Sequence, residues 1–345
     1  DKIRYDDIAQ GQLGDCWLMC SLAAIAENEV LVRDLFDLKE CNPSTGTYVV
    51  RLCKDGSWKR MILDDSIPCV PGGGPLYSQC KNGYLWCMLV EKAFAKSNGS
   101  YAAIRTGFPY EALIDLTGAP YKEFNLQDPA TKESIRDGSL WQRLCKYDGY
   151  NYVMTLSTSG VDHRTEGGNR SGGGLVAGHA YSLIGVHEMP SKGLKLCKIR
   201  NPWGSFEWDG DWSDKSLLWT EETKREFGWS DEDDGIFWMS FDDMVSNFVG
   251  INVCLVRHTG LGTKVWNEDR KKICYKFSRS GNGSEVESVE MFEFKVKEEG
   301  AEAFLTVHQP DKRRIGSPDY FDIGVTVLKK NADSSGYSLV GYMSP

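Results

Sequence analysis

One cysteine of the eleven in this 345-residue chain has neighbours suited to nucleophilic chemistry. Cys16 ends the segment QGQLGDC at residues 10–16 and directly precedes the apolar run 17–26. A helix that begins here would direct unpaired backbone N–H groups and the positive end of its dipole at the sulfur, which favours the thiolate. The Gln10 amide and the Cys16 N–H would stabilise an oxyanion formed by attack on a carbonyl. The alternative is a buried structural cysteine, because most free cysteines are of that kind.

A general base and a residue that would orient it occur later in the chain. Of the five histidines, His179 lies where a glycine-rich segment gives way to the apolar run 180–186. The next strand-like run ends in RNPWG at residues 200–204, which contains Asn201. An asparagine carbonyl that accepts the second imidazole N–H fixes the tautomer of the ring, and Trp203 would shield that bond. Taken alone, a core histidine and a turn asparagine are the alternatives; together with the cysteine they predict a Cys–His–Asn protease.

These three motifs, in this order and spacing, resemble the protease core of the calpain family over roughly residues 1–258. Residues 62–68 and 89–96 are also similar to that family. The resemblance implies an α+β fold, namely a papain-like core of two subdomains with the active site in the cleft between them. It also implies a calcium-regulated cysteine endopeptidase that cleaves protein substrates. The implied catalytic residues are Cys16, His179, Asn201 and Gln10.

The periodicity of apolar residues predicts two units that would position these groups. The first unit, residues 1–118, is expected to contain helices over residues 17–26, 30–38 and 84–96 and a hairpin of strands 48–53 and 59–63. The second unit, residues 119–260, is expected to contain a helix near 134–146 and strands at 152–156, 180–186, 194–199, 235–239 and 251–257. Because the cysteine lies in the first unit and the histidine and asparagine in the second, closure of the two units would assemble the catalyst.

The third predicted unit, residues 261–345, is part of a β-sandwich. Apolar and polar residues alternate in four short runs, at 273–277, 289–296, 303–307 and 323–328. Their position resembles that of the C2-like domain that follows the calpain core, which implies contact with membranes or phospholipids. The chain contains no EF-hand loop of the DxDxDG type, so the calcium-binding helical domain of conventional calpains is not expected.

Calcium is the cofactor that the resemblance implies. A calcium ion takes about six to eight oxygen ligands, several of them carboxylates on loops. Two residues match the first family site and three match the second: Asp7 and Glu91, and then Glu207, Asp214 and Asp234. The second site departs from the family, because Ile236 stands where a glutamate is usual. A solvated acidic loop is the alternative interpretation of the run at residues 231–234.

Composition excludes other classes of protein. The net charge of −9 disfavours nucleic acid as a partner, because phosphate binding needs a basic face. Eleven cysteines without a CxxC pair disfavour both a complete disulfide framework and a zinc cluster, and they favour a cytoplasmic location. No apolar signal region opens the sequence. Two other functions remain open: a calcium-independent papain-like protease, and a catalytically silent scaffold that binds partners or membranes.

Overall fold

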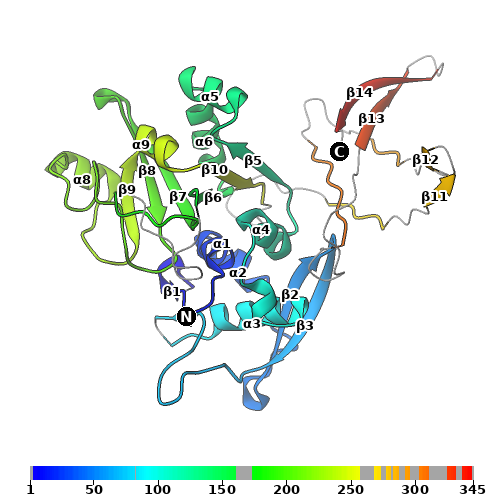
Figure 1. Ribbon diagram of the computed structural model, residues 1–345, viewed down its shortest axis with the longest axis horizontal. Helices are drawn as coiled ribbons and strands as arrows, with labels where there is room; N and C mark the ends of the chain where they lie inside the picture. The colour runs from blue at the N-terminus through cyan, green and yellow to red at the C-terminus, as the bar shows by residue number, and fades with distance from the viewer. Residues whose placement is uncertain are drawn as a thin grey trace.

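The computed structural model describes ten stretches of the chain: residues 3–81, 83–160, 173–256, 268–272, 277–280, 283–286, 292–295, 303–310, 325–331 and 336–343. Helices and short strands of the N-terminal third pack against a six-stranded antiparallel sheet formed further along the chain (Figure 1). Within the described part, no helix is both long and apolar enough to cross a membrane.

Helix α1 (Cys16–Ala26) is the central element of the N-terminal region, and all eleven of its residues are buried. Its sequence CWLMCSLAAIA is apolar on every side, which is typical of a helix enclosed by its neighbours. It contacts other helices of the N-terminal region on one side and strands of the sheet on the other (Figure 1). The other helices of this region are α2 (Glu29–Arg33), α3 (Trp86–Asn98) and α4 (Pro109–Thr117), with 3-10 turns η1 (Tyr5–Asp7), η2 (Pro43–Thr45) and η3 (Ala102–Ile104).

Two pairs of strands accompany these helices. Strands β2 (Thr47–Lys54) and β3 (Ser57–Asp64) form the predicted hairpin, and both turn residues, Asp55 and Gly56, have φ values in the left-handed region, at 54° and 70°. Such a turn matches the twist of the paired strands. A second pair, β1 (Ile8–Ala9) and β4 (Gln79–Cys80), was not predicted.

The six-stranded sheet has the order β5-β10-β6-β7-β8-β9. Its strands are β5 (Tyr121–Asn125), β6 (Val153–Ser157), β7 (Ala180–Met189), β8 (Leu194–Arg200), β9 (Ile236–Ser240) and β10 (Gly250–Cys254). One face carries large apolar side chains, among them Met154 and Tyr181, which pack with helices α6 (Ser139–Gly149) and α9 (Phe241–Asn247). The neighbouring Ser182 instead donates its hydroxyl to the carbonyl of Cys20 in α1, at 2.8 Å. The face of the sheet that contacts α1 therefore carries a small, polar side chain at this point.

Several element predictions need correction. The helix predicted over residues 30–38 ends at Arg33, because Phe36 forms a bridge with Val50 of the hairpin. The helix predicted near 134–146 is two helices, α5 (Pro129–Arg136) and α6, separated at Gly138, whose φ of 78° breaks the helical path. Strand β5 and helices α4, α8 (Glu221–Phe227) and α9 were missed, while the remaining predicted strands of the sheet are confirmed within a few residues.

The described C-terminal residues form two separate antiparallel pairs, at the right of Figure 1. They are β11 (Phe277–Ser280) with β12 (Gly283–Val286), and β13 (Val325–Lys330) with β14 (Tyr337–Met343). Of the four predicted runs, the last is confirmed from residue 325, and residues 303–307 form no strand. Most of the other two runs lies outside the described residues. The partial β-sandwich and the three domain ranges stay predictions.

Candidate active site

Helix α1 begins at Cys16, as the sequence predicts. The backbone N–H groups of Leu18 and Met19 both donate to the carbonyl of Asp15, at 2.8 and 3.0 Å, which closes the first turn. Cys16 is 7% exposed. Its thiol therefore lies at the positive end of a well-formed helix, where the thiolate is favoured.

The loop that leads to Cys16 packs directly against the backbone of the segment before β4. A Cβ atom on Gly11 would lie 1.8 Å from the carbonyl oxygen of Tyr77, so only glycine fits. The neighbouring Gln12 donates its N–H to the carbonyl of Leu76 at 3.0 Å. These contacts fix the loop in front of Cys16 to the chain that precedes β4.

His179 and Asn201 form the predicted pair. His179 Nε2 and Asn201 Oδ1 are 2.9 Å apart, and both side chains are buried. Trp203 also donates its backbone N–H to Asn201 Oδ1, at 3.1 Å, while Asn201 Nδ2 donates to the carbonyl of Phe206, at 2.9 Å. These two bonds fix which end of the amide is the acceptor, so Nε2 of the histidine is the donor. The acceptor nitrogen of the neutral imidazole is then Nδ1.

Trp203 covers this hydrogen bond. The ring centroids of His179 and Trp203 are 4.6 Å apart with the planes tilted by 51°, and Tyr181 presents its edge to the imidazole at 5.0 Å. The backbone of Asn201 is also held, because its N–H donates to the carbonyl of Gly235 at 2.8 Å. The predicted shielding by Trp203 is therefore present.

Helix α1, which begins at Cys16, packs against strand β7, which begins directly after His179. Cys16, Cys20 and Ala180 form one buried cluster, and Ala180 is the residue after His179. On the other side, Gln10 donates its backbone N–H to the carbonyl of Pro202, at 3.2 Å, next to Asn201. Residues from three distant parts of the chain therefore meet near the start of α1.

The side-chain amide of Gln10 lies in the loop just before α1. Its Nε2 donates to the carbonyl of Leu13 at 2.7 Å and lies 3.4 Å from Asp15 Oδ1, and the residue is 6% exposed. The amide is thus bonded within the loop that carries the nucleophile. Its role as an oxyanion donor stays a prediction.

Two residues of this region were missed by sequence reasoning. Asp15, fully buried, lies beside Glu91 of α3, and Glu91 accepts from the N–H and hydroxyl of Ser78 at 3.1 and 2.6 Å. Burial and then repulsion by Glu91 raise the pKa of Asp15 well above its usual value, and burial also raises the pKa of Glu91. Arg200, also fully buried, donates to the carbonyl of Ile8 at 2.7 Å. The partners of Asp15 and Arg200 are remote in sequence, so no local sequence pattern predicts these contacts.

The carboxylates predicted for the first calcium site are bonded to protein groups. Asp7, 2% exposed, accepts the N–H of Arg4 at 3.1 Å, whereas Glu91 is bonded to Ser78 and lies against Asp15. Hydrogen bonds of these two carboxylates therefore go to different partners. The chemistry of the ligands suits calcium, but Glu91 would have to leave its present partner to bind it.

The carboxyl groups of the second predicted calcium site repel one another, as expected of a site that binds a cation. Burial and the neighbouring Glu207 raise the pKa of Asp214 to about 8, with further repulsion from Asp234. Asp214 Oδ1 is buried and has no hydrogen-bond partner in the described structure. Asp214, Asp234 and Glu232 line a cavity of about 140 Å³ together with Ile236. A cation would relieve this repulsion, although no group of three metal-ligating side chains is arranged to hold a metal in the described residues.

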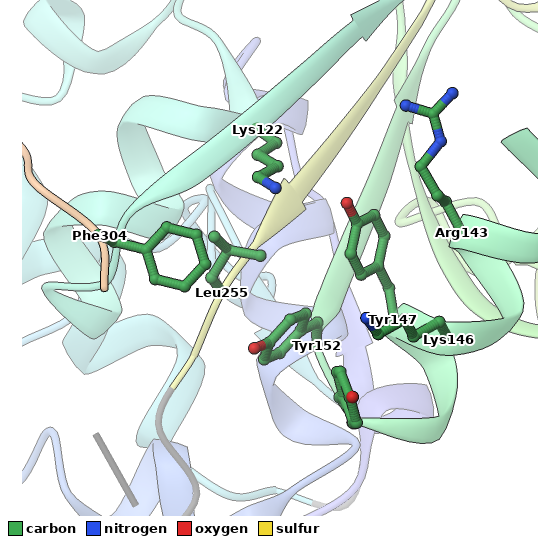
Figure 2. A pocket seen from close by; sticks show the side chains of 8 residues that line it. Lys122, Arg143, Lys146, Tyr147, Tyr152, Leu255 and Phe304 are labelled. Atoms are coloured by element: carbon green, nitrogen blue, oxygen red, sulfur yellow. The ribbon is translucent and has the colours of Figure 1, made fainter. Parts of the chain in front are cut away.

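A different cavity, of about 170 Å³, lies apart from all these residues (Figure 2). It is lined by Lys122, Arg143, Lys146, Tyr147, Tyr150, Tyr152, Leu255 and Phe304. Figure 2 shows basic side chains of β5 and α6 and the ring of Phe304 around it. Because it contains none of the predicted catalytic residues, it is not the active site.

Comparison with known proteins agrees with this geometry. The model of the calpain family of cysteine proteases matches residues 1–255. The chain is 36% identical over 263 residues to the rice calpain-type cysteine protease ADL1 and 33% identical over 361 residues to the Arabidopsis thaliana calpain-type cysteine protease DEK1. It is 32% identical over 369 residues to mouse calpain-5. The chain therefore belongs to the calpain family of cysteine proteases.

The matches cover more of this chain than of its relatives. They include 74%, 96% and 95% of the chain, but 12%, 16% and 57% of the rice, Arabidopsis and mouse proteins respectively. The chain thus corresponds to one part of longer proteins, and that part includes the residues described above.

Proposed function

We propose that this chain is a calcium-regulated cysteine endopeptidase that cleaves protein substrates through Cys16, His179 and Asn201. The observation that carries the proposal is the buried pair of His179 and Asn201, with the asparagine acceptor fixed by Trp203. The position of Cys16 at the start of α1, packed against the residue that follows His179, supports the same conclusion.

The chemistry is acyl transfer to the thiolate. Cys16 attacks the carbonyl carbon of the peptide bond, and the developing oxyanion accepts the N–H of Cys16 at the start of the helix. Nδ1 of His179 first takes the thiol proton of Cys16 and then gives it to the leaving amine, and water hydrolyses the thioester with His179 as the base, which restores the Cys16 thiol. Asn201 keeps the imidazole in the required tautomer and orientation.

Calcium enters the proposal through the carboxylates of both regions. Glu207, Asp214 and Asp234 would hold one ion, and its charge would offset the repulsion that now raises the pKa of Asp214. Asp7 and Glu91 would contribute to a second ion near the nucleophile loop. An ion bound preferentially in the active arrangement shifts the population toward it.

The substrates in this proposal are proteins, the compartment is the cytoplasm, and the C-terminal strands contact phospholipids. The net charge of −9 disfavours nucleic acid as the substrate, the absence of a disulfide among the ten described cysteines suits a reducing compartment, and the position of the strands after the protease core supports the contact with phospholipids.

The decisive experiment measures peptide cleavage and labelling by a thiol-reactive substrate analogue, each with calcium and with chelator. Cys16→Ser is expected to lower turnover by a factor on the order of 10⁴ or more and to abolish labelling, whereas Cys41→Ser leaves both unchanged. Undiminished hydrolysis by Cys16→Ser would reject the protease assignment. Full activity in chelator would reject only the calcium part.

The second candidate is a calcium-independent protease of the same mechanism. It is favoured by Ile236, whose apolar side chain lines the cavity beside Asp214 and Asp234. The chelator experiment separates the two functions.

A further inference from the structure

Two cysteines outside the catalytic residues lie in contact. Cys80 Sγ in β4 and Cys87 Sγ in the first turn of α3 are 2.7 Å apart. Both are buried, at 8% and 0% exposure, and the ten described cysteines are all free thiols. No mechanism proposed above uses this pair.

We propose that Cys80 and Cys87 form an intramolecular disulfide when the protein meets a disulfide oxidant, and that this bond joins β4 to α3. Bonded sulfurs lie about 2.05 Å apart, so a shift of well under an ångström brings the two atoms together. The sulfurs approach from neighbouring elements that already pack on each other.

The position of β4 gives this bond a structural consequence. Cys80 pairs with Ile8 in β1, and Lys81 donates its N–H to the carbonyl of Asp7 at 2.7 Å. Strand β4 thus lies between α3 and the strand that leads to the nucleophile. A disulfide would make covalent a connection between β4 and α3 that otherwise depends on hydrogen bonds such as those from Ser78 to Glu91.

The oxidation is balanced with glutathione disulfide as the oxidant. The Cys80 thiolate attacks one sulfur of the oxidant, which forms a mixed disulfide and releases one glutathione thiolate. The Cys87 thiol then loses its proton and attacks the Cys80 sulfur, which releases the second glutathione thiolate. Overall two protein thiols are oxidised, one glutathione disulfide is reduced to two thiols, and the two protein protons pass to them.

The order of attack follows from the surroundings of the two thiols. Burial raises the pKa of Cys87 well above its usual value, so it remains a thiol at neutral pH. Cys80 is the more exposed of the two and meets the oxidant first. The pair lies outside the cluster that contains Cys16, so this inference stands or falls separately from the proposed protease function.

The test uses the full chain with Cys16→Ser, which removes the reactive nucleophile. The protein is incubated with glutathione disulfide, remaining thiols are alkylated under denaturing conditions, and tryptic peptides are analysed by mass spectrometry. Trypsin cuts after Lys81, between the two cysteines, so a disulfide holds two peptides together until a reductant separates them. The expected result is this linked pair, with Tm raised by about 5 °C over the reduced protein.

Matched variants complete the test. Cys87→Ser and Cys80→Ser are expected to lose the oxidation-dependent rise in Tm, whereas Cys41→Ser keeps it. Recovery of both peptides in alkylated form after oxidation would overturn the proposal. The same rise in Tm in Cys87→Ser would also overturn it. If a serine variant fails to fold, the linked peptides of the parent chain still decide the question.

Discussion

Two pairs of carboxyl groups lie close together in this protein, one at the start of α1 and one near Asn201. Neighbouring negative charges repel each other, and the surroundings of the two pairs differ. Asp15 and Glu91 are 0% and 2% exposed, and Ser78 and Gln10 donate to them. Glu207 and Asp214 are only half-buried, and Glu207 accepts the N–H of Gly235 at 2.8 Å. Asp214 Oδ1 is left with no partner in the described structure.

The two pairs differ in burial, and therefore in how open they are to a ligand. In the first pair burial raises both pKa values, and protein donors reach both carboxyl groups, although Asp15 Oδ2 has no hydrogen-bond partner in the described structure. In the second pair burial also raises both pKa values, that of Asp214 to about 8, but the pair is only half-buried and Asp214 Oδ1 accepts no hydrogen bond in the described structure, so a cation can reach it and replace the proton. The first pair stabilises the loop of Cys16, and the second is the better candidate for calcium.

The largest expected effect comes from breaking the first pair. Glu91→Ala leaves Asp15 buried without its partner and creates a cavity, which should cost about 3 kcal/mol in the free energy of unfolding. Urea denaturation in chelator measures this loss. The matched control Glu91→Gln keeps a hydrogen-bonding side chain of the same size, so it should cost less than about 1 kcal/mol. Equal losses in the two variants would contradict a paired role for Glu91.

The second prediction concerns stabilisation by calcium. At a concentration 100 times its dissociation constant, calcium bound only to the folded protein adds about 2.7 kcal/mol to the free energy of unfolding. Asp214→Asn should remove most of the contribution from the second site, whereas Asp242→Asn, on the exposed surface of α9, should leave it intact. Thermal unfolding with and without calcium measures both. An unchanged response in Asp214→Asn would exclude this carboxylate as a ligand.

The third prediction tests whether residue 236 limits calcium binding at the second pair. Ile236→Glu adds a carboxylate to the lining of the cavity shared by Asp214 and Asp234. We expect calcium affinity to rise by about tenfold, equivalent to about 1.4 kcal/mol, in a calorimetric titration. Ile236→Gln provides the neutral control and should gain much less. No gain in the glutamate variant would mean that residue 236 does not face the ion.

The smallest effect is on the pH dependence of stability in chelator. Burial and the neighbouring Glu207 raise the pKa of Asp214 in the folded protein to about 8, well above that of an aspartate in the unfolded chain, so its stabilising protonated form is lost as pH rises through this range. Asp214→Asn cannot ionise. Its Tm should therefore rise relative to the parent protein between pH 4 and pH 8, by a few degrees in all, and the difference should level off above about pH 8. A difference that stays constant with pH would contradict the raised pKa.

Local sequence patterns predicted the elements whose form depends on near neighbours. The all-apolar run after Cys16 predicts a buried helix, and the Asp55-Gly56 turn predicts the hairpin. The helix predicted over 30–38 was wrong, because Phe36 and Asp37 bond to the hairpin instead of continuing the helix. The pattern could not show this competition, since the competing partner lies further along the chain.

The sequence by itself determined the identities of the proposed nucleophile, base and orienting residue, because their motifs are short and chemically specific. Only the tertiary structure decided which oxygens and sulfurs face one another: Asp15 with Glu91, Glu207 with Asp214, and Cys80 with Cys87. The physical reason is that pKa shifts and thiol contacts depend on burial and on distances of a few ångströms between elements. The packing of elements that are far apart in the sequence sets those distances, and the spacing of residues along the chain does not.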